Sequence, residues 1–459
     1  MKPLMVLGCT SDAGKSWLVT AMCRWFAREG VRVAPFKAQN MSNNARVVEG
    51  GEIGVAQWLQ AKAAGIEPDV RMNPVLLKPE ADTQSQVVVR GIVDRELSAT
   101  PWEHRHDALW APMAESFDEL RDAFDLVIIE GAGSPAEINL RDQVNNRMIG
   151  HADAVGLLAS DIDRGGSFAH LYGTWALVPP ATRDRLAGYV LNRFRGDAAL
   201  LSPGPERLTE LTGMAFAGVV PLIEHDLPRE EGANEKSSRR SDAPTVVIPR
   251  FPFGSNLDEF HLLATVASIR WATTAAEFGG LDPERDLVVL PGSKHVVADL
   301  EWMRQRGIDL AVRGAVGRGI RCVGVCGGAM MLGSTIEDSQ GVEGGRRASA
   351  AGLGLLDHHT VMSTTKTIER VNLEAFGRTY PGYEIRYGEL SGGGRFVTQG
   401  GVTATTVHGL FEQPRFLEDL LGVQAEHVLE STFELLADTV EAHLDAGWLR
   451  SLLEVSVNE

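Results

Sequence analysis

Short apolar runs alternate with longer stretches of helical periodicity through the first half of the chain. The runs expected to be strands are residues 4–7, 31–35, 86–90, 126–129, 154–159 and 188–191. Strands that are joined through helices pair in parallel and are covered by helices on both faces. The pattern therefore predicts an α/β fold with a doubly wound, mostly parallel sheet.

This pattern breaks at residues 229–243, which hold no aliphatic side chain larger than alanine and are dense in charge, serine and glycine. Such a composition is typical of a solvated linker. Beyond it, strands are expected at 245–248, 286–290, 321–325 and 402–407, and an amphipathic helix is expected at 430–455. The predicted organisation is a first domain at 1–228, a linker at 229–243 and a second α/β domain at 244–459.

Composition narrows the class of partner. The chain has 459 residues, and its 44 Lys and Arg against 61 Asp and Glu give a formal net charge of -17. A surface of this sign repels a nucleic-acid backbone, so nucleic acid is not expected as a partner. The first apolar run is too short for a secretion signal, and no stretch approaches the ~20 apolar residues of a membrane helix. We expect a cytoplasmic protein without membrane contact.

Four cysteines stand at positions 9, 23, 322 and 326, and no two of them form a CxxC pair. So few in a chain of this length indicate neither a disulfide scaffold nor a structural zinc site. Buried thiols are the ordinary expectation for Cys9, Cys23 and Cys322, because free cysteine is among the most buried residue types. Cys326 differs because of the residues around it.

The first strand leads directly into Gly8-Cys9-Thr10-Ser11-Asp12-Ala13-Gly14-Lys15-Ser16, and a helical pattern follows. A strand, a glycine-rich loop and a helix in this order are typical of a phosphate-binding loop. Lys15 would reach the terminal phosphates and Ser16 would bind Mg²⁺. The nucleotide-binding candidates in the loop are Gly8, Thr10, Asp12, Gly14, Lys15 and Ser16. The alternative is a glycine-rich turn that only joins strand to helix.

Glu130 ends the apolar strand predicted at 126–129. Ligands of open α/β sheets bind at the carboxyl ends of the strands, so Glu130 is a candidate for binding Mg²⁺ or its water. The alternative is a carboxylate that only caps the following helix.

Cys326 follows the strand predicted at 321–325 and precedes Gly327 and Gly328, after which residues 329–336 have a helical pattern. Glycines allow a sharp strand-to-helix turn that lifts a nucleophile above the sheet, and the helix N-terminus favours the thiolate. A cysteine nucleophile needs a base. His408, which follows the predicted strand at 402–407, is the candidate, although a structural histidine is the ordinary interpretation of His408 taken alone.

Irregular stretches of the chain resemble a known family. They are Ala-Pro-Phe-Lys-Ala-Gln-Asn-Met-Ser at 34–42 and residues 51–54, 72–79, 161–166 and 192–197. With these and the two sites in this order, the chain resembles the cobyric acid synthases, glutamine-dependent enzymes of cobalamin biosynthesis, over nearly its whole length. The resemblance implies an N-terminal P-loop domain like that of dethiobiotin synthetase and a C-terminal domain like the class I glutamine amidotransferases.

The reaction that this resemblance implies is the amidation of four peripheral carboxylates of (adenosyl)cobyrinic acid a,c-diamide through acyl phosphates. ATP, glutamine and the corrinoid polycarboxylate would be the small-molecule substrates, with Mg²⁺ as the metal. By the resemblance, Lys37, Gln39, Asn40, Ser42 and Asn43 lie near the γ-phosphate and the substrate carboxylate. Glu52 and Glu130 lie near Mg²⁺, and Asn192 lies near the adenine.

The glutaminase half departs from the family pattern. Ala329 and Met330 replace Tyr-Gln after the cysteine elbow, Arg386 replaces a histidine, and His295-Val296 replaces Asn-Thr. The loop at 251–257 is also unlike the family.

Two further features of this half concern its catalytic groups. The loop at 291–294 resembles the one that supplies oxyanion-hole amides in such glutaminases. Leu410 stands where many of these enzymes carry the glutamate of His-x-Glu, so the third catalytic residue is open, with Glu384 and Glu412 as weak candidates.

Two other hypotheses compete with a two-activity synthase. A divergent paralogue could amidate another polycarboxylate or use free ammonia. A P-loop regulatory or binding ATPase could keep only a remnant glutaminase domain. The presence of both Cys326 and His408 argues against the remnant, because such a domain has no physical need of either.

Overall fold

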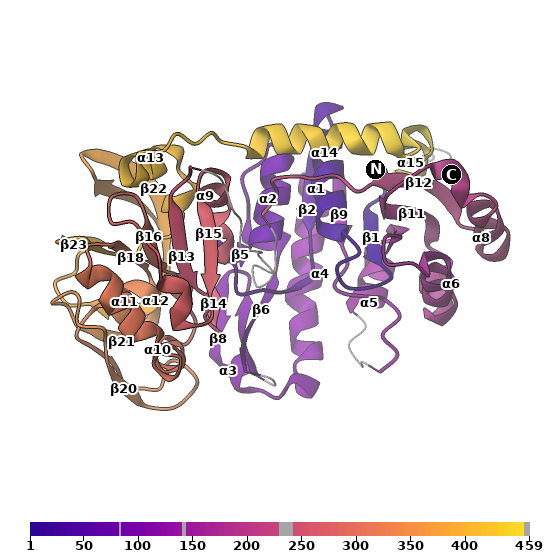
Figure 1. Cartoon of the computed structure of the whole chain (residues 1–459). Coiled ribbons are helices and arrows are strands. Elements are labelled where there is room, and N and C mark those ends of the chain that lie inside the picture. Colours follow the sequence, from indigo (N-terminus) through magenta and orange to yellow (C-terminus); the bar gives the residue numbers. More distant parts are fainter. Residues whose placement is uncertain (82–83, 140–143, 229–241, 454–459) are drawn as a thin grey trace.

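A computed structural model describes residues 1–81, 84–139, 144–228 and 242–453 of the chain. Figure 1 shows two α/β halves side by side, with the N-terminal half in indigo and purple and most of the second half in orange tones. Among the described residues, no helix has both the length and the apolar character needed to cross a bilayer.

The N-terminal half is built on a six-stranded sheet with the strand order β12-β11-β10-β1-β9-β2, and every neighbouring pair is parallel. This sheet consists of β1 (Leu4–Gly8), β2 (Val33–Phe36), β9 (Leu126–Glu130), β10 (Val155–Asp161), β11 (Leu186–Phe194) and β12 (Ala215–Pro221). The predicted doubly wound, mostly parallel sheet is confirmed, with strand ends within a few residues of those expected.

Alternate residues of β1 pack into two different cores, as the period of a strand requires. Leu4 and Val6 face the core under α1 and α2, whereas Met5 and Leu7 face the core under α4 and α5. The helices of this half are α1 (Lys15–Arg28), α2 (Val55–Ala63), α3 (Arg95–Ala99), α4 (His106–Ala123), α5 (Val144–His151), α6 (Ser167–Leu177), α7 (Pro180–Arg183) and α8 (Gly204–Thr212).

The strand predicted at 86–90 forms, but not in the parallel sheet. It is β7, which pairs antiparallel with β6 and β8 in a separate four-stranded sheet of order β3-β6-β7-β8. The apolar run is the same in either sheet, so the pattern alone could not decide its partner. The small strands are β3 (Gln39–Met41), β4 (Ala45–Val48), β5 (Gly51–Gly54), β6 (Val75–Ala81), β7 (Gln84–Val89) and β8 (Ile92–Asp94).

The second half repeats the α/β plan, as predicted. Its main sheet has the order β15-β13-β16-β18-β24-β23, and all pairs are parallel except β23 with β24. The strands are β13 (Thr245–Pro249), β15 (Ser268–Ala272), β16 (Leu287–Leu290), β18 (Arg321–Val325), β23 (Phe396–Gln399) and β24 (Val402–Thr405). The helices are α9 (His261–Val266), α10 (Val296–Gln305), α11 (Ile308–Gly317), α12 (Gly327–Leu332) and α13 (Pro414–Leu421).

The helix predicted at 329–336 was wrong at its end. Helix α12 stops at Leu332, and Ile336 lies in β19 (Thr335–Asp338), which pairs with β20 (Ala348–Ala351) and β21 (Thr360–Ala375). The long β21 pairs antiparallel with β22 (Arg378–Leu390), and this hairpin contacts β4 of the N-terminal half. A second small sheet thus fills the space between the halves.

The chain returns to the N-terminal half at its end. The amphipathic stretch expected at 430–455 forms two helices, α14 (Leu429–His443) and α15 (Ala446–Leu453), and residue 455 lies outside the described residues. Figure 1 shows α14, in yellow, running along the N-terminal half beside α1. Phe433, Leu436 and Val440 are buried in the core that α1 forms on the first sheet.

Most of the predicted linker, residues 229–241, lies outside the described residues. The boundaries at 228 and 244 therefore stay predictions, while apolar side chains of α14 and α15 between Leu429 and Leu449 pack in the core of the first half.

Candidate active sites

The loop between β1 and α1 is shaped around Lys15. Gly14 has a φ of 86° and begins α1 in the left-handed region, where glycine is favoured. A Cβ on Gly8 would lie 2.8 Å from the ammonium nitrogen of the buried Lys15. The backbone conformation thus requires Gly14, and the position of Lys15 requires Gly8. Thr10 lies between these two glycines in the sequence and is half-buried.

Glu130, at the end of β9, gathers polar groups from three elements. It accepts hydrogen bonds from the Ser16 hydroxyl at 2.8 Å, the Lys37 ammonium at 2.9 Å and the Gln60 amide at 2.6 Å. Burial favours the neutral form, but the charges of Lys37 and Lys15 and the hydrogen bonds hold the pKa of Glu130 below its ordinary value. The structure therefore joins three predicted residues, Ser16, Lys37 and Glu130, in one cluster.

A hydroxyl and an ionised carboxylate fit Mg²⁺, which prefers oxygen ligands and takes few from the protein when phosphates supply the rest. No group of three or more His, Cys, Asp or Glu suited to a metal occurs among the described residues. The Ser16 and Glu130 pair is consistent with a metal held jointly by the protein and a nucleotide.

Asn192 lies near the carboxyl end of β11 and contacts the loop. Its amide nitrogen donates to the carbonyl of Ala13 at 2.8 Å, and its oxygen accepts from the backbone of Arg193. Asp12, at the exposed tip, pairs with Arg193 at 2.9 Å and Arg164 at 3.0 Å. Asp12 and Asn192 thus both lie at the loop, and their roles toward phosphates and adenine stay predictions.

The segment predicted to line the substrate carboxylate lies between β2 and β4. Asn40 is buried and donates to the side chain of Gln57 at 3.1 Å, and the Ser42 hydroxyl accepts from the backbone of Asn44. The side-chain oxygen of Asn43 is buried and has no hydrogen-bond partner, a state that a bound group could relieve. Gln39 is half-buried on the same segment.

Glu52 lies in a different environment from Glu130. It is fully buried on β5 and pairs with the ammonium groups of Lys78 and Lys366, the latter from β21 of the second half. Burial opposes its charge, but the two lysines lower the pKa of Glu52 to about 2. The structure thus places Glu52 in an ion-pair cluster between the halves, and its proposed contact with Mg²⁺ stays a prediction.

Cys326 occupies a strained turn between β18 and α12. Its φ of 50° and ψ of -105° are unusual for a residue with a side chain, and strain of this kind gathers at functional sites. A Cβ on Gly328 would lie 2.0 Å from the carbonyl oxygen of Leu290, so the glycine permits the close packing of the elbow. The predicted cysteine elbow is present.

His408 and Glu259 complete a buried triad with Cys326. The Nδ1 of His408 lies 2.9 Å from Glu259 Oε1, and the other carboxylate oxygen accepts from the backbone N–H of Gly409 at 3.0 Å. The Cys326 sulfur, whose S–H donates to the carbonyl of Ile385 at 3.7 Å, lies close enough to His408 to influence its ionisation. Nucleophile, base and orienting carboxylate stand in the order that cysteine-dependent acyl transfer needs.

The charge state of His408 follows from these neighbours. Burial disfavours its protonated form, but the Glu259 carboxylate and the Cys326 sulfur more than offset this and raise the pKa of His408 to about 10. A cationic imidazole beside a cysteine favours the nucleophilic thiolate.

Glu259 is the residue that the sequence interpretation missed. The two weak candidates for the third position were wrong, since Glu384 pairs with Arg386 and Arg395, and Glu412 pairs with Arg46. A signal was present in the adjacent acids at 258 and 259, which interrupt an apolar stretch before α9. Both acids are buried, and such a pair needs specific partners.

The loop at 291–294 lies against the elbow. A Cβ on Gly327 would lie 2.8 Å from the backbone nitrogen of Ser293, and one on Gly292 would lie 3.0 Å from the His408 ring. The Ser293 hydroxyl donates to Asp299 at 2.5 Å, which fixes the loop on α10. The loop expected to supply an oxyanion-hole amide therefore packs directly against the elbow, and its role toward an oxyanion stays a prediction.

The residues that depart from the family pattern have partners inside the protein. Arg386 donates to Glu384 and to the carbonyl of Gly388, and the ring of His295 packs edge-on against Phe253 at 4.6 Å between centroids. The carbonyl of Ala329 bonds the ring of His358 at 2.9 Å.

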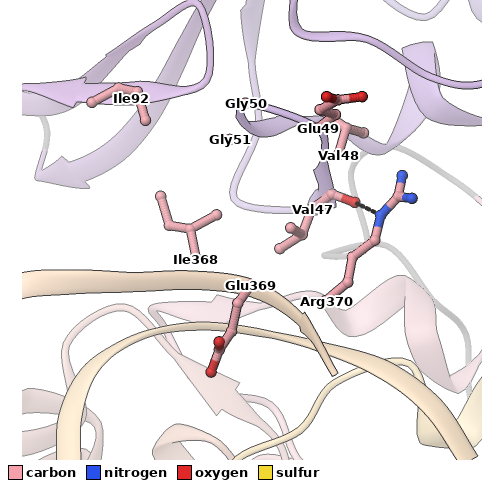
Figure 2. Close-up of a pocket in the computed structure, with 9 residues that line it drawn as sticks. All are labelled: Val47, Val48, Glu49, Gly50, Gly51, Ile92, Ile368, Glu369 and Arg370. Atoms are coloured by element: carbon pink, nitrogen blue, oxygen red, sulfur yellow. Dashed lines mark hydrogen bonds between the residues drawn. The ribbon is translucent and has the colours of Figure 1, made fainter. Parts of the chain in front are cut away.

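A cavity of about 510 Å³ opens at the seam between the halves. Figure 2 shows one wall formed by the turn from Val47 to Gly51 with Ile92, and the other formed by residues 368–370 of β21. The Arg370 side chain donates to the carbonyl of Val47 at 3.2 Å across it. None of the predicted site residues lines this cavity.

Comparisons with known proteins agree with the two halves. Residues 4–232 match the family described as CobQ/CobB/MinD/ParA nucleotide binding domain, and residues 245–416 match the CobB/CobQ-like glutamine amidotransferase domain. These matches confirm the predicted pairing of a P-loop domain with a glutamine amidotransferase domain.

Full-length relatives give the same result. The cobyric acid synthase of Variovorax paradoxus (strain S110) is 49% identical, covering 98% of this chain and 99% of that protein. The one from Polaromonas naphthalenivorans (strain CJ2) is 46% identical over 98% and 99%. The one from Deinococcus radiodurans is 47% identical over 98% and 100%.

Proposed function

Because the chain belongs to the cobyric acid synthase family, we propose that it amidates the peripheral carboxylates of a corrinoid with ammonia from glutamine, at the expense of ATP. The protein is a glutamine amidotransferase ligase of cobalamin biosynthesis. The proposed substrate is cobyrinic acid a,c-diamide, with four amides formed through acyl phosphates.

The glutaminase step is supported by the triad. The Cys326 thiolate attacks the side-chain carbonyl of glutamine, and the oxyanion is met by N–H groups of the elbow and the 291–294 loop. His408, held by Glu259, gives its proton to the leaving ammonia. Water then attacks the thioester, His408 takes its proton, and glutamate leaves with the thiol restored.

The synthetase step is supported by the cluster around Glu130. Lys15 and Lys37 bring two positive charges to the place where the transferred phosphate would lie, which stabilises the spread negative charge of phosphoryl transfer. A substrate carboxylate near Asn43 would attack the γ-phosphorus of ATP and form the acyl phosphate, while the bond to the bridging oxygen breaks and ADP leaves. Ammonia then displaces phosphate from it and leaves the amide.

Mg²⁺ would be held by the Ser16 hydroxyl and by Glu130, directly or through water, where it would neutralise the phosphate charge. The other steps of the synthetase reaction are assigned to side chains of the N-terminal half.

The observation that carries the proposal is the buried triad of Cys326, His408 and Glu259, because a domain that only binds has no need of it. The test incubates the protein with ATP, Mg²⁺ and cobyrinic acid a,c-diamide, with either glutamine or ammonia, and follows the corrinoid by mass. Each amide replaces a hydroxyl by an amino group. No change in corrinoid mass with either nitrogen source would refute the corrinoid substrate.

A Cys326→Ala variant is expected to lose glutamine-dependent amidation and to keep ammonia-dependent amidation, because it lacks only the nucleophile. Cys322→Ala is the matched control, since Cys322 is buried in the strand that leads to the elbow. Loss of both activities in Cys326→Ala would show that the cysteine is needed for structure instead.

A further inference from the structure

One segment of the N-terminal half reaches the back of the triad. The backbone N–H of Ala45 donates to the side-chain oxygen of Asn256 at 2.9 Å, and the N–H of Leu257 donates to the side-chain oxygen of Asn44 at 3.2 Å. These reciprocal bonds clamp the start of η5 (Leu257–Phe260), the 3₁₀ helix that carries Glu259.

Arg46 follows in the same strand and is buried inside the second half. Its guanidinium donates to the carboxylates of Asp258 and Glu412. Asp258 immediately precedes Glu259, and Glu412 belongs to η7 (Leu410–Glu412), which follows His408 and Gly409. One cation therefore ties together the two short helices that flank the base and its orienting carboxylate.

Arg46 also reaches His408 through an aromatic ring. Its guanidinium carbon lies 5.3 Å from the centroid of the Tyr383 ring, and that ring stacks on His408 at 5.5 Å with an angle of 19° between the planes. Tyr383 and His408 exchange two backbone hydrogen bonds, of 3.1 and 2.8 Å. The base is therefore stacked against a ring that contacts Arg46, and it is held at Nδ1 by Glu259, whose neighbour Asp258 pairs with Arg46.

The other end of this segment lies in the synthetase cluster. Lys37 pairs with Glu130 beside Ser16, and Asn43 offers a buried oxygen without a hydrogen-bond partner just before the clamp. Residues 37–46 thus run without interruption from the proposed phosphate site to the back of the triad. A displacement of this segment by substrate would move the groups that align His408.

We infer that Arg46 is a positioning residue for glutamine hydrolysis, through which the synthetase half holds Glu259 and His408 in line with Cys326. This inference rests on the proposed function and adds a coupling to it. Glutamine hydrolysis depends on the conformation of residues 37–46, so that ammonia is released when the synthetase site is ready to use it.

The positive charge of Arg46 is the reason that its replacement is expected to slow glutamine hydrolysis. Without the guanidinium, the buried Asp258 and the half-buried Glu412 remain close to each other and to Glu259 with no cation between them, and carboxylates so placed repel and rearrange. A displacement of catalytic groups by about 1 Å costs on the order of 100-fold in rate. Lysine keeps the charge but not the forked geometry, so Arg46→Lys is expected to retain more activity than Arg46→Gln.

The experiment measures glutamate release and corrinoid amidation in wild type, Arg46→Gln and Arg46→Lys. In Arg46→Gln, kcat for glutamate release with all substrates present is expected to fall about 10- to 100-fold. The KM for glutamine and the ammonia-dependent amidation should stay within about 3-fold, since binding and phosphoryl transfer use other groups. Arg46→Lys should restore most of the loss.

A second variant covers the case in which Arg46→Gln does not fold. Asn256 has a φ of 54°, so Asn256→Gly keeps a backbone that glycine accepts and removes only the bond to Ala45. It is expected to lower glutamate release and spare ammonia-dependent amidation. Arg370→Ala is the control, because Arg370 donates across the seam to Val47, next to Arg46, without touching η5 or η7.

Three results would overturn the inference. The first is an equal loss of glutamine-dependent and ammonia-dependent amidation in Arg46→Gln and Asn256→Gly. The others are a loss of glutamate release in Arg370→Ala as large as that in Arg46→Gln, and a wild-type rate of glutamate release in Arg46→Gln. Failure of the proposed function would look different. In that case wild type itself makes no amide from ammonia, while glutamate release still reports the effect of Arg46.

Discussion

At the scale of single residues, Glu259 binds both the side chain of His408, the base of the glutaminase site, and the backbone N–H of Gly409, the next residue. The local sequence was enough to locate Lys15 and Cys326, because each follows a strand and opens a helix. It could not locate Glu259, which lies 149 positions from His408 and meets it only when the second sheet has formed.

We predict that Glu259→Gln lowers kcat for glutamine hydrolysis on the order of 10³- to 10⁴-fold, because a neutral amide cannot stabilise the imidazolium. Ammonia-dependent amidation should be unchanged, and a ratio of the two activities like that of wild type would contradict the role. Glu277→Gln is a suitable control, since Glu277 is a half-buried acid that caps a short helix elsewhere in this half.

Glu259 also determines how glutamine hydrolysis depends on pH, through its effect on His408. Since the pKa of His408 is raised to about 10, its imidazolium persists at neutral pH and is lost as the pH rises toward 10. The stability that this charge contributes is complete below pH 6.5, the ordinary value, and disappears between 6.5 and about 10. We predict that the alkaline limb of kcat/KM for glutamine moves to lower pH in Glu259→Gln, and an unmoved limb would argue against this pairing.

The cysteines give a chemical test. Burial raises the pKa of Cys9 to about 11 and of Cys322 to about 12, and it raises that of Cys23 further. Thiols with such values are inert at neutral pH. We predict that limited iodoacetamide modifies Cys326 first and abolishes glutamine-dependent turnover, as read by peptide mass. Earlier modification of any other cysteine would contradict the assignment.

At the scale of elements, helix α14 shows what a periodic pattern can and cannot tell. The amphipathic stripe predicted a helix with one buried face, and the helix is present. The pattern did not indicate which core the apolar face of the helix packs against, because any apolar surface can bury such a face. Strand β7 gives the same lesson, since its apolar run formed a strand in another sheet than expected.

Packing of α14 makes a prediction for stability. Leu436 is fully buried against the α1 core, whereas its neighbour Leu435 is 44% exposed. Leu436→Ala is expected to lower the free energy of unfolding of the N-terminal half by about 2–5 kcal/mol, and Leu435→Ala by no more than about 0.5 kcal/mol. Urea unfolding followed by tryptophan fluorescence measures both, and equal effects would contradict the packing.

At the scale of the whole molecule, Glu52 joins the halves through Lys366 of β21, and it also pairs with Lys78 of its own half. Its pKa is lowered to about 2, so the stability from this cluster is present above pH 4.5 and is lost as the pH falls toward 2. We predict that the halves separate in this range, seen as an increase in radius of gyration by X-ray scattering.

Glu52→Gln should show the separation already at neutral pH, because it leaves two buried ammonium groups without a carboxylate, at a cost on the order of 3–5 kcal/mol. Glu67→Gln is the control, since Glu67 pairs with Arg370 at an exposed site worth about 1 kcal/mol or less. An unchanged radius in Glu52→Gln would show that other contacts hold the seam.

The order in which the chain is made gives the return of α14 and α15 a further meaning. The N-terminal half leaves the ribosome before the second half, yet part of the apolar surface of α1 is covered by α14 and α15, which follow the second half along the chain. During synthesis that part of the α1 surface stays uncovered until the whole of the second half has been made. The half that begins to fold first is therefore the last to be closed.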